Sequence, residues 1–257
     1  MTQSLHDSAQ QGFSSSAELY ATVRPNYPDT LSVWLKQQLM LSPQAHLLDL
    51  GAGTGKLIPQ LLKISSHLTA VEPIQAMRTQ LEQRYPNIVS LEGISQAIPL
   101  ADHSVDALFC AQAFHWFSDL ESLQEIARVL KPQGHLILIW NQRDLTVDWV
   151  KALHDCIVPL EGDTPRYHSG QWQQVFKDTS LFESRQQHVI DHPQTGLVKD
   201  VVSKRLLSTS FIAALPSHKQ YNLKQKFESI IKQYTHKNID DVIVFPYQTY
   251  IYHYQKI

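Results

Sequence analysis

The stretch that decides the fold is Leu47-Leu48-Asp49-Leu50-Gly51-Ala52-Gly53-Thr54-Gly55-Lys56-Leu57. Its first four residues are three apolar side chains and one acid, a pattern typical of a short strand in the core of a sheet. Three glycines at alternate positions follow, and the apolar residues after them have helical spacing. We expect a strand, a glycine turn and a helix, with backbone N–H groups of the helix facing a ligand.

The spacing of the glycines bears on which ligand this turn binds. A dinucleotide fingerprint, Gly-x-Gly-x-x-Gly, would put its third glycine at position 56, where this chain has Lys56. The next apolar run, residues 68–71, ends in Glu72, whose carboxylate is suited to accept hydrogen bonds from both hydroxyls of a ribose. A glycine turn followed by this acid is typical of nucleoside-binding α/β folds.

Composition limits the classes of protein to consider. A chain of 257 residues can hold one large α/β domain. The net charge is −2 and no block of Lys or Arg stands out, so we expect no nucleic-acid partner. No apolar run approaches the roughly 18–20 residues that span a bilayer, and residues 1–16 are too polar for a signal peptide. Neither the two cysteines nor the histidines have metal-ligand spacing, and we expect a soluble, reduced, cytoplasmic protein without a metal site.

Strand and helix patterns alternate between residues 47 and 140, which predicts a parallel sheet with helices on both faces. The further predicted strands of this part are residues 68–71, 88–91, 105–110 and 135–140. The predicted helices are residues 74–84 and 120–130, the second ended by the stop signal Lys131-Pro132-Gln133-Gly134. Another helix is expected to begin with Asp29 as its N-cap.

The pattern is looser beyond Asn141. Helices are expected at residues 147–157, 171–177, 195–207 and 222–234, and a strand at 184–190. Residues 242–254 alternate and contain Pro246, which predicts a final edge strand. We expect one domain over residues 1–257. Residues 1–40 are expected to form an N-terminal lid region, residues 41–145 the cofactor-binding core, and residues 146–257 the part that completes the sheet. A helical cap is expected at about 195–234.

The N-terminal segment carries a second motif, Tyr20-Ala21-Thr22-Val23-Arg24-Pro25-Asn26-Tyr27-Pro28. Its two flanking prolines disfavour a helix at Asn26 and Tyr27. The segment is either a surface lead-in whose aromatic side chains pack on the domain, or a lid that lays Tyr20 and Arg24 over a cofactor or substrate.

Several of these stretches together resemble one family, the class I S-adenosylmethionine-dependent methyltransferases of the type 11 group. They are residues 47–57, Ala70-Val71-Glu72-Pro73 with Met77, Ala113-Phe114-His115-Trp116-Phe117, residues 125–134, Trp140-Asn141, residues 205–210 and Phe245-Pro246-Tyr247. The N-terminal motif and the His-Trp pair are similar to the branch that includes trans-aconitate methyltransferase-like proteins. The resemblance implies a Rossmann-like three-layer α/β sandwich, with a mostly parallel seven-stranded sheet, an antiparallel last strand and a helical cap.

The resemblance also implies S-adenosyl-L-methionine as cofactor and S-adenosyl-L-homocysteine as product. The residues it assigns to cofactor binding are Tyr20, Asp49, Gly51, Ala52, Gly53, Glu72, Pro73, Met77, Ser95, Gln96 and Ala111. Met77 would lie against the adenine, although it could equally be a core residue of its helix. The chain departs from the family at Ile94, where many members have an Asp that accepts from the adenine amino group, so recognition there would use backbone groups near Ser95.

The candidate catalytic residues are His115, Arg24 and Tyr20, and the candidate substrate-binding residues are Arg24, His115, Trp116 and Arg205. His115 follows the fourth strand and could be a general base or a structural histidine bonded to backbone. Arg24 and Arg205 could clamp an anionic substrate, since a guanidinium matches a carboxylate bidentately, or could have surface or capping roles.

We therefore expect methyl transfer to a carboxylate or hydroxyl oxygen of a small molecule, driven mainly by proximity and orientation. Two alternatives stay open: a protein that binds the cofactor without turnover, and a dinucleotide-dependent oxidoreductase. A nucleic-acid methyltransferase would need a partner protein to supply a basic surface.

Overall fold

The computed structural model describes residues 23–177 and 179–257. They form two compact units. The sheet unit comprises Asn26–Asn141, Pro165–Ile190 and Thr249–Ile257, and the helical unit comprises residues 23–25, Gln142–Thr164 and Asp191–Gln248. The expectation of a single domain stays a prediction, and Tyr20 lies outside the described residues.

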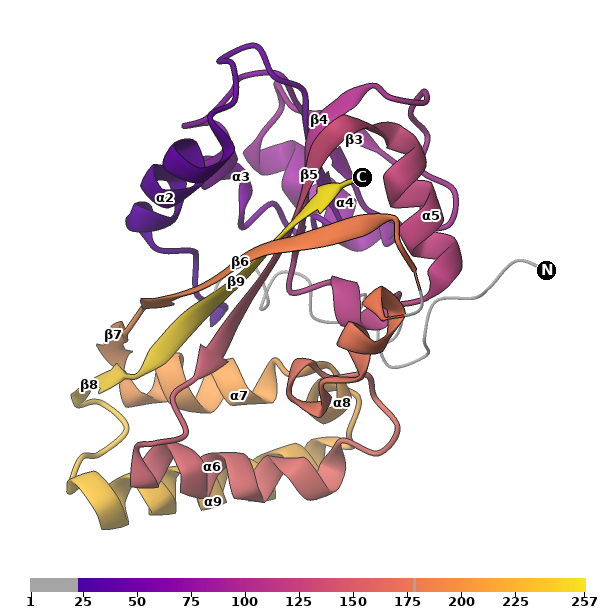
Figure 1. The fold of residues 1–257 in the computed structure, drawn as a ribbon. Coiled ribbons are helices and arrows are strands. Elements are labelled where there is room, and N and C mark those ends of the chain that lie inside the picture. Colours follow the sequence, from indigo (N-terminus) through magenta and orange to yellow (C-terminus); the bar gives the residue numbers. More distant parts are fainter. Residues whose placement is uncertain (1–22, 178) are drawn as a thin grey trace. The chain divides into compact units, whose positions relative to one another are not determined.

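A seven-stranded sheet has the strand order β3-β2-β1-β4-β5-β9-β6 (Figure 1). Its strands are β1 (Leu47–Leu50), β2 (Leu68–Val71), β3 (Val89–Leu91), β4 (Val105–Ala111), β5 (Leu130–Arg143), β6 (Phe182–Asp191) and β9 (Tyr247–Lys256). Strands β1 to β5 pair in parallel. The side chains of Gln255 and Thr249 on β9 bond the backbone of Gln133 and the side chain of Asn141, at opposite ends of β5, so β9 is antiparallel to β5. The mostly parallel sheet with an antiparallel last strand is confirmed.

The position predicted for the last strand at the edge of the sheet is wrong. β9 lies between β5 and β6, and Pro246 separates it from β8 (Val242–Phe245). β8 forms a two-stranded antiparallel sheet with β7 (Gln194–Leu197). The helix predicted from residue 195 therefore begins too early, because β7 covers these residues. A Cβ at Gly196 would lie 2.6 Å from Cγ1 of Val201, so the glycine lets the following helix pack directly on this strand.

The helices of the sheet unit are α2 (Asp29–Leu39), α3 (Ile58–Leu61), α4 (Gln75–Arg84) and α5 (Leu120–Val129). Short 3₁₀ turns are η1 (Phe114–Trp116), η3 (Tyr167–Ser169) and η4 (Gln171–Phe176). Pro28, not Asp29, is the N-cap of α2. The stop signal at residues 131–134 does end α5, but these residues continue as the start of β5. The pairing of β4 with β5 shifts register there to accommodate them.

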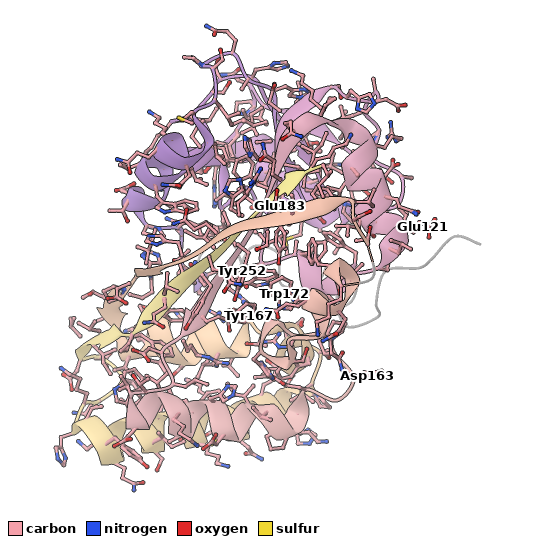
Figure 2. All side chains as sticks on the ribbon, viewed as in Figure 1. Glu121, Asp163, Tyr167, Trp172, Glu183 and Tyr252 are labelled. Carbon is pink, nitrogen blue, oxygen red and sulfur yellow. The ribbon has the colours of Figure 1, made fainter. Side chains whose placement is uncertain are left out.

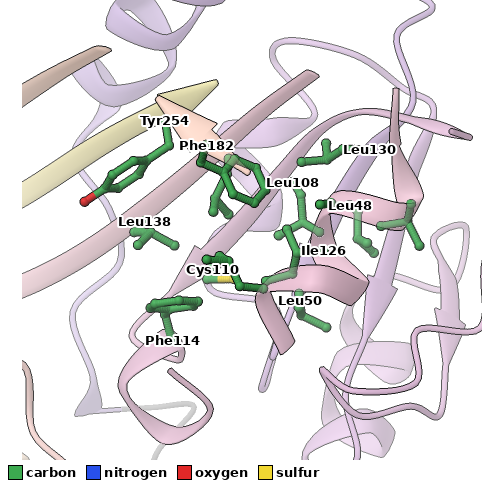
Figure 3. Close-up of a cluster of buried hydrophobic side chains, with 14 of the residues drawn as sticks. Leu48, Leu50, Leu108, Cys110, Phe114, Ile126, Leu130, Leu138, Phe182 and Tyr254 are labelled. Carbon is green, nitrogen blue, oxygen red and sulfur yellow. The ribbon is translucent and has the colours of Figure 1, made fainter. Parts of the chain in front are cut away.

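Side chains alternate between the two faces of the sheet and form two cores. Leu48, Leu108 and Leu138 pack with α5 on one face, and Leu47 and Phe109 pack with α2, α3 and α4 on the other. The first core also holds Trp172 and Tyr252, which lie close together in Figure 2. Figure 3 shows part of the same core around Cys110 and Ile126. Helices on both faces confirm the three-layer arrangement.

The helical unit packs around a core of its own. Its helices are α6 (Asp148–Ile157), the 3₁₀ turn η2 (Val158–Leu160), the π-helix η5 (Lys199–Lys204), α7 (Arg205–Leu207), α8 (Ser210–Ala213) and α9 (Ser217–Thr235). α6 and α9 lie side by side in Figure 1, and Val150 and Leu153 share a buried cluster with Phe227 and Ile231. Helices therefore do form within residues 195–234, and their role as a cap stays a prediction.

Among residues 23–177 and 179–257, no helix combines the length and the apolar composition needed to cross a membrane.

Candidate functional site

The glycine turn after β1 is tied to the neighbouring strand. The backbone N–H groups of Gly51 and Ala52 both donate to the carbonyl of Val71, at 2.8 and 3.2 Å. Gly51 and Gly53 have positive φ angles of 70° and 57°. A Cβ at Gly51 would lie 2.7 Å from the Cβ of Ala113, whereas, within residues 23–177 and 179–257 and apart from the neighbours of Gly53 in the chain, no atom lies within 4 Å of a Cβ built at Gly53. Gly51 is thus required by the packing of the protein, and Gly53 leaves its space open for a ligand.

Glu72 follows β2 and holds the turn from the other side. Its Oε2 accepts from the N–H of Gly53 at 2.8 Å and its Oε1 from the N–H of Ile74 at 2.9 Å. The side chain is buried, and burial raises the pKa of Glu72 although both hydrogen bonds favour its charged form. Each oxygen keeps a second acceptor site, so the carboxylate can still accept from two further hydroxyl groups.

Asp49 is the most unusual group in the sheet unit. It is 1% exposed, and neither of its carboxylate oxygens has a hydrogen-bond partner in the described part of the chain. Burial raises the pKa of Asp49 to about 7, and the nearby Glu72 carboxylate adds to the effect. A buried carboxylate without a donor or a cation costs several kcal/mol. Its place beside the glycine turn suits a cationic or hydrogen-bond-donating ligand.

The remaining residues predicted to bind the cofactor lie on or next to α4, α5, β2 and β4. Met77 is buried on α4, five residues beyond Glu72. The hydroxyl of Ser95 donates to Gln96 and accepts from Ser122, and the amide of Gln96 donates to Asp119, the N-cap of α5. These side chains anchor the loop after β3 to the start of α5. Pro73 stands between β2 and α4, and Ala111 ends β4.

His115 lies in η1, after β4, and is bonded to a tryptophan of β5. The indole Nε1 of Trp140 donates to Nδ1 of His115 at 3.0 Å. Because an indole N–H can only donate, Nδ1 must be unprotonated, and the proton of the neutral ring is on Nε2. If Nδ1 took up a proton, its N–H would face the N–H of Trp140 with no acceptor between them. This repulsion opposes a role of His115 as a general base. Trp116 lies against the same ring, with centroids 5.2 Å apart.

Three polar residues that the sequence did not assign to a site, Asn141, Thr249 and Lys56, join the N-terminal motif to the sheet. The amide of Asn141 donates to the carbonyl of Asn26 at 3.0 Å and accepts from Thr249 at 2.6 Å. The ammonium of Lys56 donates to the side chain of Asn26 at 3.1 Å. Burial lowers the pKa of Lys56 to about 8, and nearby Arg84 adds to the effect. No sequence signal distinguished these partners, because each bond joins residues far apart in the chain.

Two of the predicted substrate residues belong to the helical unit. Arg24 donates from Nε to Oγ of Ser208 at 3.2 Å and from Nη2 to the carbonyl of Ser208 at 2.9 Å. Arg205 is buried, with its guanidinium carbon 5.8 Å from the ring centre of Tyr247. The structure thus groups Arg24 with Arg205 in one unit, and Asp49, Glu72 and His115 in the other.

Comparison with known proteins identifies the family. The sequence profile of a methyltransferase domain matches residues 48–138. An uncharacterised methyltransferase-like protein of Schizosaccharomyces pombe is 33% identical over 240 residues, which cover 92% of each chain. An uncharacterised methyltransferase of Mycobacterium tuberculosis is 41% identical over 154 residues, 60% of this chain and 61% of that one.

Solved structures share the fold. A candidate type II methyltransferase from Anaeromyxobacter dehalogenans aligns with a TM-score of 0.67 at 21% identity, over 91% of this chain and 97% of that one. The matches do not single out the trans-aconitate methyltransferase-like branch, which stays a prediction. The matched region runs from the middle of β1 into β5, and so contains the glycine turn, Glu72 and His115. The chain belongs to the methyltransferase family of this profile and is an S-adenosylmethionine-dependent methyltransferase.

Proposed function

We propose that this protein transfers the methyl group of S-adenosylmethionine to an oxygen atom of a small molecule, with the cofactor held by the sheet unit. The observation that carries the cofactor site is the unpartnered, buried carboxylate of Asp49 beside the glycine turn. An ammonium group supplies the positive charge and the N–H donors that this carboxylate lacks.

The neighbouring groups fit the rest of the cofactor. The open space at Gly53 admits a ligand against the backbone, and Glu72 keeps acceptor sites for two ribose hydroxyls. Met77 is the candidate for the adenine face, and Ser95, Gln96, Pro73, Ala52 and Ala111 complete the assignment. When bound, S-adenosylmethionine supplies a methyl group activated by an adjacent sulfonium.

The acceptor is proposed to be an oxygen that needs no strong base. Trp140 occupies the Nδ1 lone pair of His115, so the ring presents an Nε2–H donor instead of a base. A carboxylate is already a nucleophile at neutral pH, whereas an alcohol must lose a proton. Positioning then accounts for most of the rate, since methyl transfer is an in-line displacement. These features favour a carboxylate over a hydroxyl acceptor.

Calorimetric titration with S-adenosylhomocysteine tests the cofactor site. Asp49→Asn is the decisive variant, because neither Asp49 oxygen bonds to a described residue and the substitution breaks no hydrogen bond of the site. We expect micromolar affinity for the wild type and a loss of about 10- to 100-fold in Asp49→Asn. Glu82→Gln, which removes a charge from an exposed position on α4, is the matched control and should bind like the wild type. Equal affinity in all three proteins would refute the assigned role of Asp49.

The nature of the acceptor is tested with methyl-labelled S-adenosylmethionine and a panel of small carboxylic acids, each paired with its alcohol. Methyl esters release labelled methanol in alkali, and methyl ethers do not. We expect the labelled product to be alkali-labile. A product stable to alkali would overturn the carboxylate assignment and leave the cofactor site untouched.

A further inference from the structure

Two buried hydrogen-bond donors of the helical unit have no acceptor among the residues that the structure describes. Arg205, in α7, is 8% exposed, and Tyr247, at the start of β9, is 2% exposed. Nε of Arg205 and the hydroxyl of Tyr247 both lack a partner in the part of the chain that the structure describes. The guanidinium carbon of Arg205 lies 5.8 Å from the centre of the Tyr247 ring, so the two donors belong to neighbouring side chains.

Burying the Nε of Arg205 and the hydroxyl of Tyr247 without acceptors lowers the stability of the fold, unless a ligand supplies the acceptors. Burying a charged group without a counter-charge costs far more than burying a paired one, and an unpaired buried hydroxyl adds to the cost. Buried polar groups in folded proteins nearly always have partners, so exceptions point to a role outside folding. The guanidinium of Arg205 forms neither an ion pair nor a hydrogen bond with any side chain or backbone group in 23–177 or 179–257.

The local backbone gives a second indication. The π-helix η5 (Lys199–Lys204) leads directly into Arg205, and π-helical turns are rare and occur frequently at functional sites. The turn after Arg205 is fixed in place, because the hydroxyl of Ser208 donates to the carbonyl of Arg205 at 2.7 Å. Arg24 bonds to both Ser208 oxygens, which brings a second positive charge to the same turn.

We propose that Arg205 and Tyr247 form a binding site for the carboxylate group of a small organic acid. The planar guanidinium donates two parallel N–H bonds to a carboxylate, and the phenol hydroxyl adds a third donor. One buried guanidinium matches the single charge of a carboxylate better than the nearly double charge of a phosphate monoester. The site uses residues of the helical unit alone and does not depend on the cofactor site.

The direct probe is the Nε–H resonance of Arg205 in the full chain labelled with ¹⁵N-arginine, assigned by its absence in Arg205→Met. Acetate, succinate and benzoate are titrated, with acetamide and inorganic phosphate as the uncharged and more highly charged comparisons. We expect a saturable shift with at least one carboxylate, with a Kd of roughly 1 mM or tighter. Acetamide should cause none, and phosphate should bind more weakly.

Three variants separate binding from folding. Tyr247→Phe removes only the hydroxyl and should weaken carboxylate binding about tenfold. Arg205→Met lacks the reporting resonance, so its carboxylate affinity is measured by calorimetry. The substitution should abolish the binding without lowering the denaturation midpoint, because it removes a buried charge that has no partner among the described residues. Lys204→Met is the matched control, since it removes one positive charge at the adjacent position, where Lys204 pairs with Asp200 in solvent. Its carboxylate affinity should equal that of the wild type.

Several outcomes would overturn the proposal: no shift with any of the three carboxylates, tighter binding of phosphate, or wild-type affinity in Arg205→Met. Binding of S-adenosylhomocysteine is measured on the same samples. If this binding fails while carboxylates still bind, the proposed cofactor site is wrong and the carboxylate site stands.

Discussion

Asp49 makes the stability of this protein depend on pH in an unusual direction. Its pKa is about 7 in the folded chain and near 3.8 when exposed, so the folded state binds the proton more tightly. The stability that this proton contributes is present at low pH and is lost as pH rises from about 4 to about 7. Without cofactor, we expect Asp49→Asn to exceed the wild type in free energy of unfolding at pH 8, by up to about 4 kcal/mol.

Urea denaturation at several pH values measures this difference. The gap between Asp49→Asn and the wild type should widen between pH 5 and pH 7 and then stay constant. A gap that does not change with pH would show that Asp49 is ionised throughout this range.

The structure predicts which ring nitrogen of His115 carries the proton in the neutral side chain. Long-range ¹H–¹⁵N spectra should show the neutral Nε2–H tautomer in the wild type, because Trp140 donates to Nδ1. Trp140→Phe removes that donor, and we expect the neutral ring to populate both tautomers. His115→Asn identifies the signals by their loss. A wild-type ring that carries its proton on Nδ1 would contradict the assignment.

Two of the three glycines in the glycine turn, Gly51 and Gly53, should respond differently to substitution by alanine. Gly51→Ala places a methyl 2.7 Å from the Cβ of Ala113 and should destabilise the fold by about 3 kcal/mol. Gly53→Ala meets no atom within 4 Å, so only its positive φ costs stability, about 1 kcal/mol. Gly53→Ala should nevertheless weaken S-adenosylhomocysteine binding at least tenfold. Denaturation and calorimetry on both variants check these two predictions. An unchanged affinity of Gly53→Ala for S-adenosylhomocysteine would show that the ligand does not contact Gly53.

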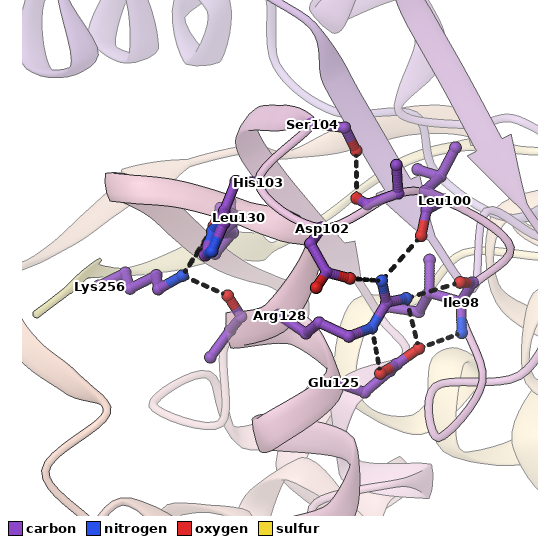
Figure 4. Close-up of polar contacts among 11 residues, drawn as sticks. Ile98, Leu100, Asp102, His103, Ser104, Glu125, Arg128, Leu130 and Lys256 are labelled. Carbon is purple, nitrogen blue, oxygen red and sulfur yellow. Dashed lines mark hydrogen bonds and ion pairs between the residues drawn. The ribbon is translucent and has the colours of Figure 1, made fainter.

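Helix α5 is held to the loop before β4 by Arg128 (Figure 4). Its guanidinium bonds to Glu125 and Asp102 and to the carbonyls of Ile98 and Leu100. Arg128→Met removes all of these bonds, although Glu125 still accepts from the N–H of Ile98 and the carbonyl of Ile98 from the N–H of Leu100. We expect a loss of about 2 kcal/mol in the free energy of unfolding. Lys151→Met, which breaks an exposed pair with Asp155, should change it by less than about 0.5 kcal/mol. Similar losses in both variants would mean that the Arg128 contacts contribute no more than an exposed ion pair.

The elements that the sequence predicted well are those with strong local patterns. Strands β1, β2 and β4 and helix α5, which has a clear apolar face and an Asp119 N-cap, were located to within one or two residues. The apolar strand predicted at residues 135–140 is longer, because β5 runs from Leu130 to Arg143. Thr195 was placed in a helix because its pairing partner, Val244, is far away in the chain. The edge position of β9 was wrong for the same reason, since its pairing with β5 and β6 depends on the whole sheet.

At the scale of the whole molecule, the glycine motif and Glu72, together with the other stretches that resemble the family, indicated the family and its cofactor. The contacts that define the chemistry of the sites could not be found that way. The bond from Trp140 to His115 and the cation–π contact of Arg205 with Tyr247 each join separate elements. The absence of partners around Asp49 likewise shows only in three dimensions.

Calorimetric titration of the wild-type chain with S-adenosylhomocysteine and, separately, with NAD tests the central claim most directly. A ribose-binding acid and a glycine turn occur in both kinds of nucleotide site, whereas a buried Asp49 carboxylate with no partner among the described residues favours a cationic or donating group. We predict micromolar binding of S-adenosylhomocysteine and no measurable binding of NAD. Binding of NAD without S-adenosylhomocysteine would contradict the cofactor assignment and the methyl-transfer function that depends on it.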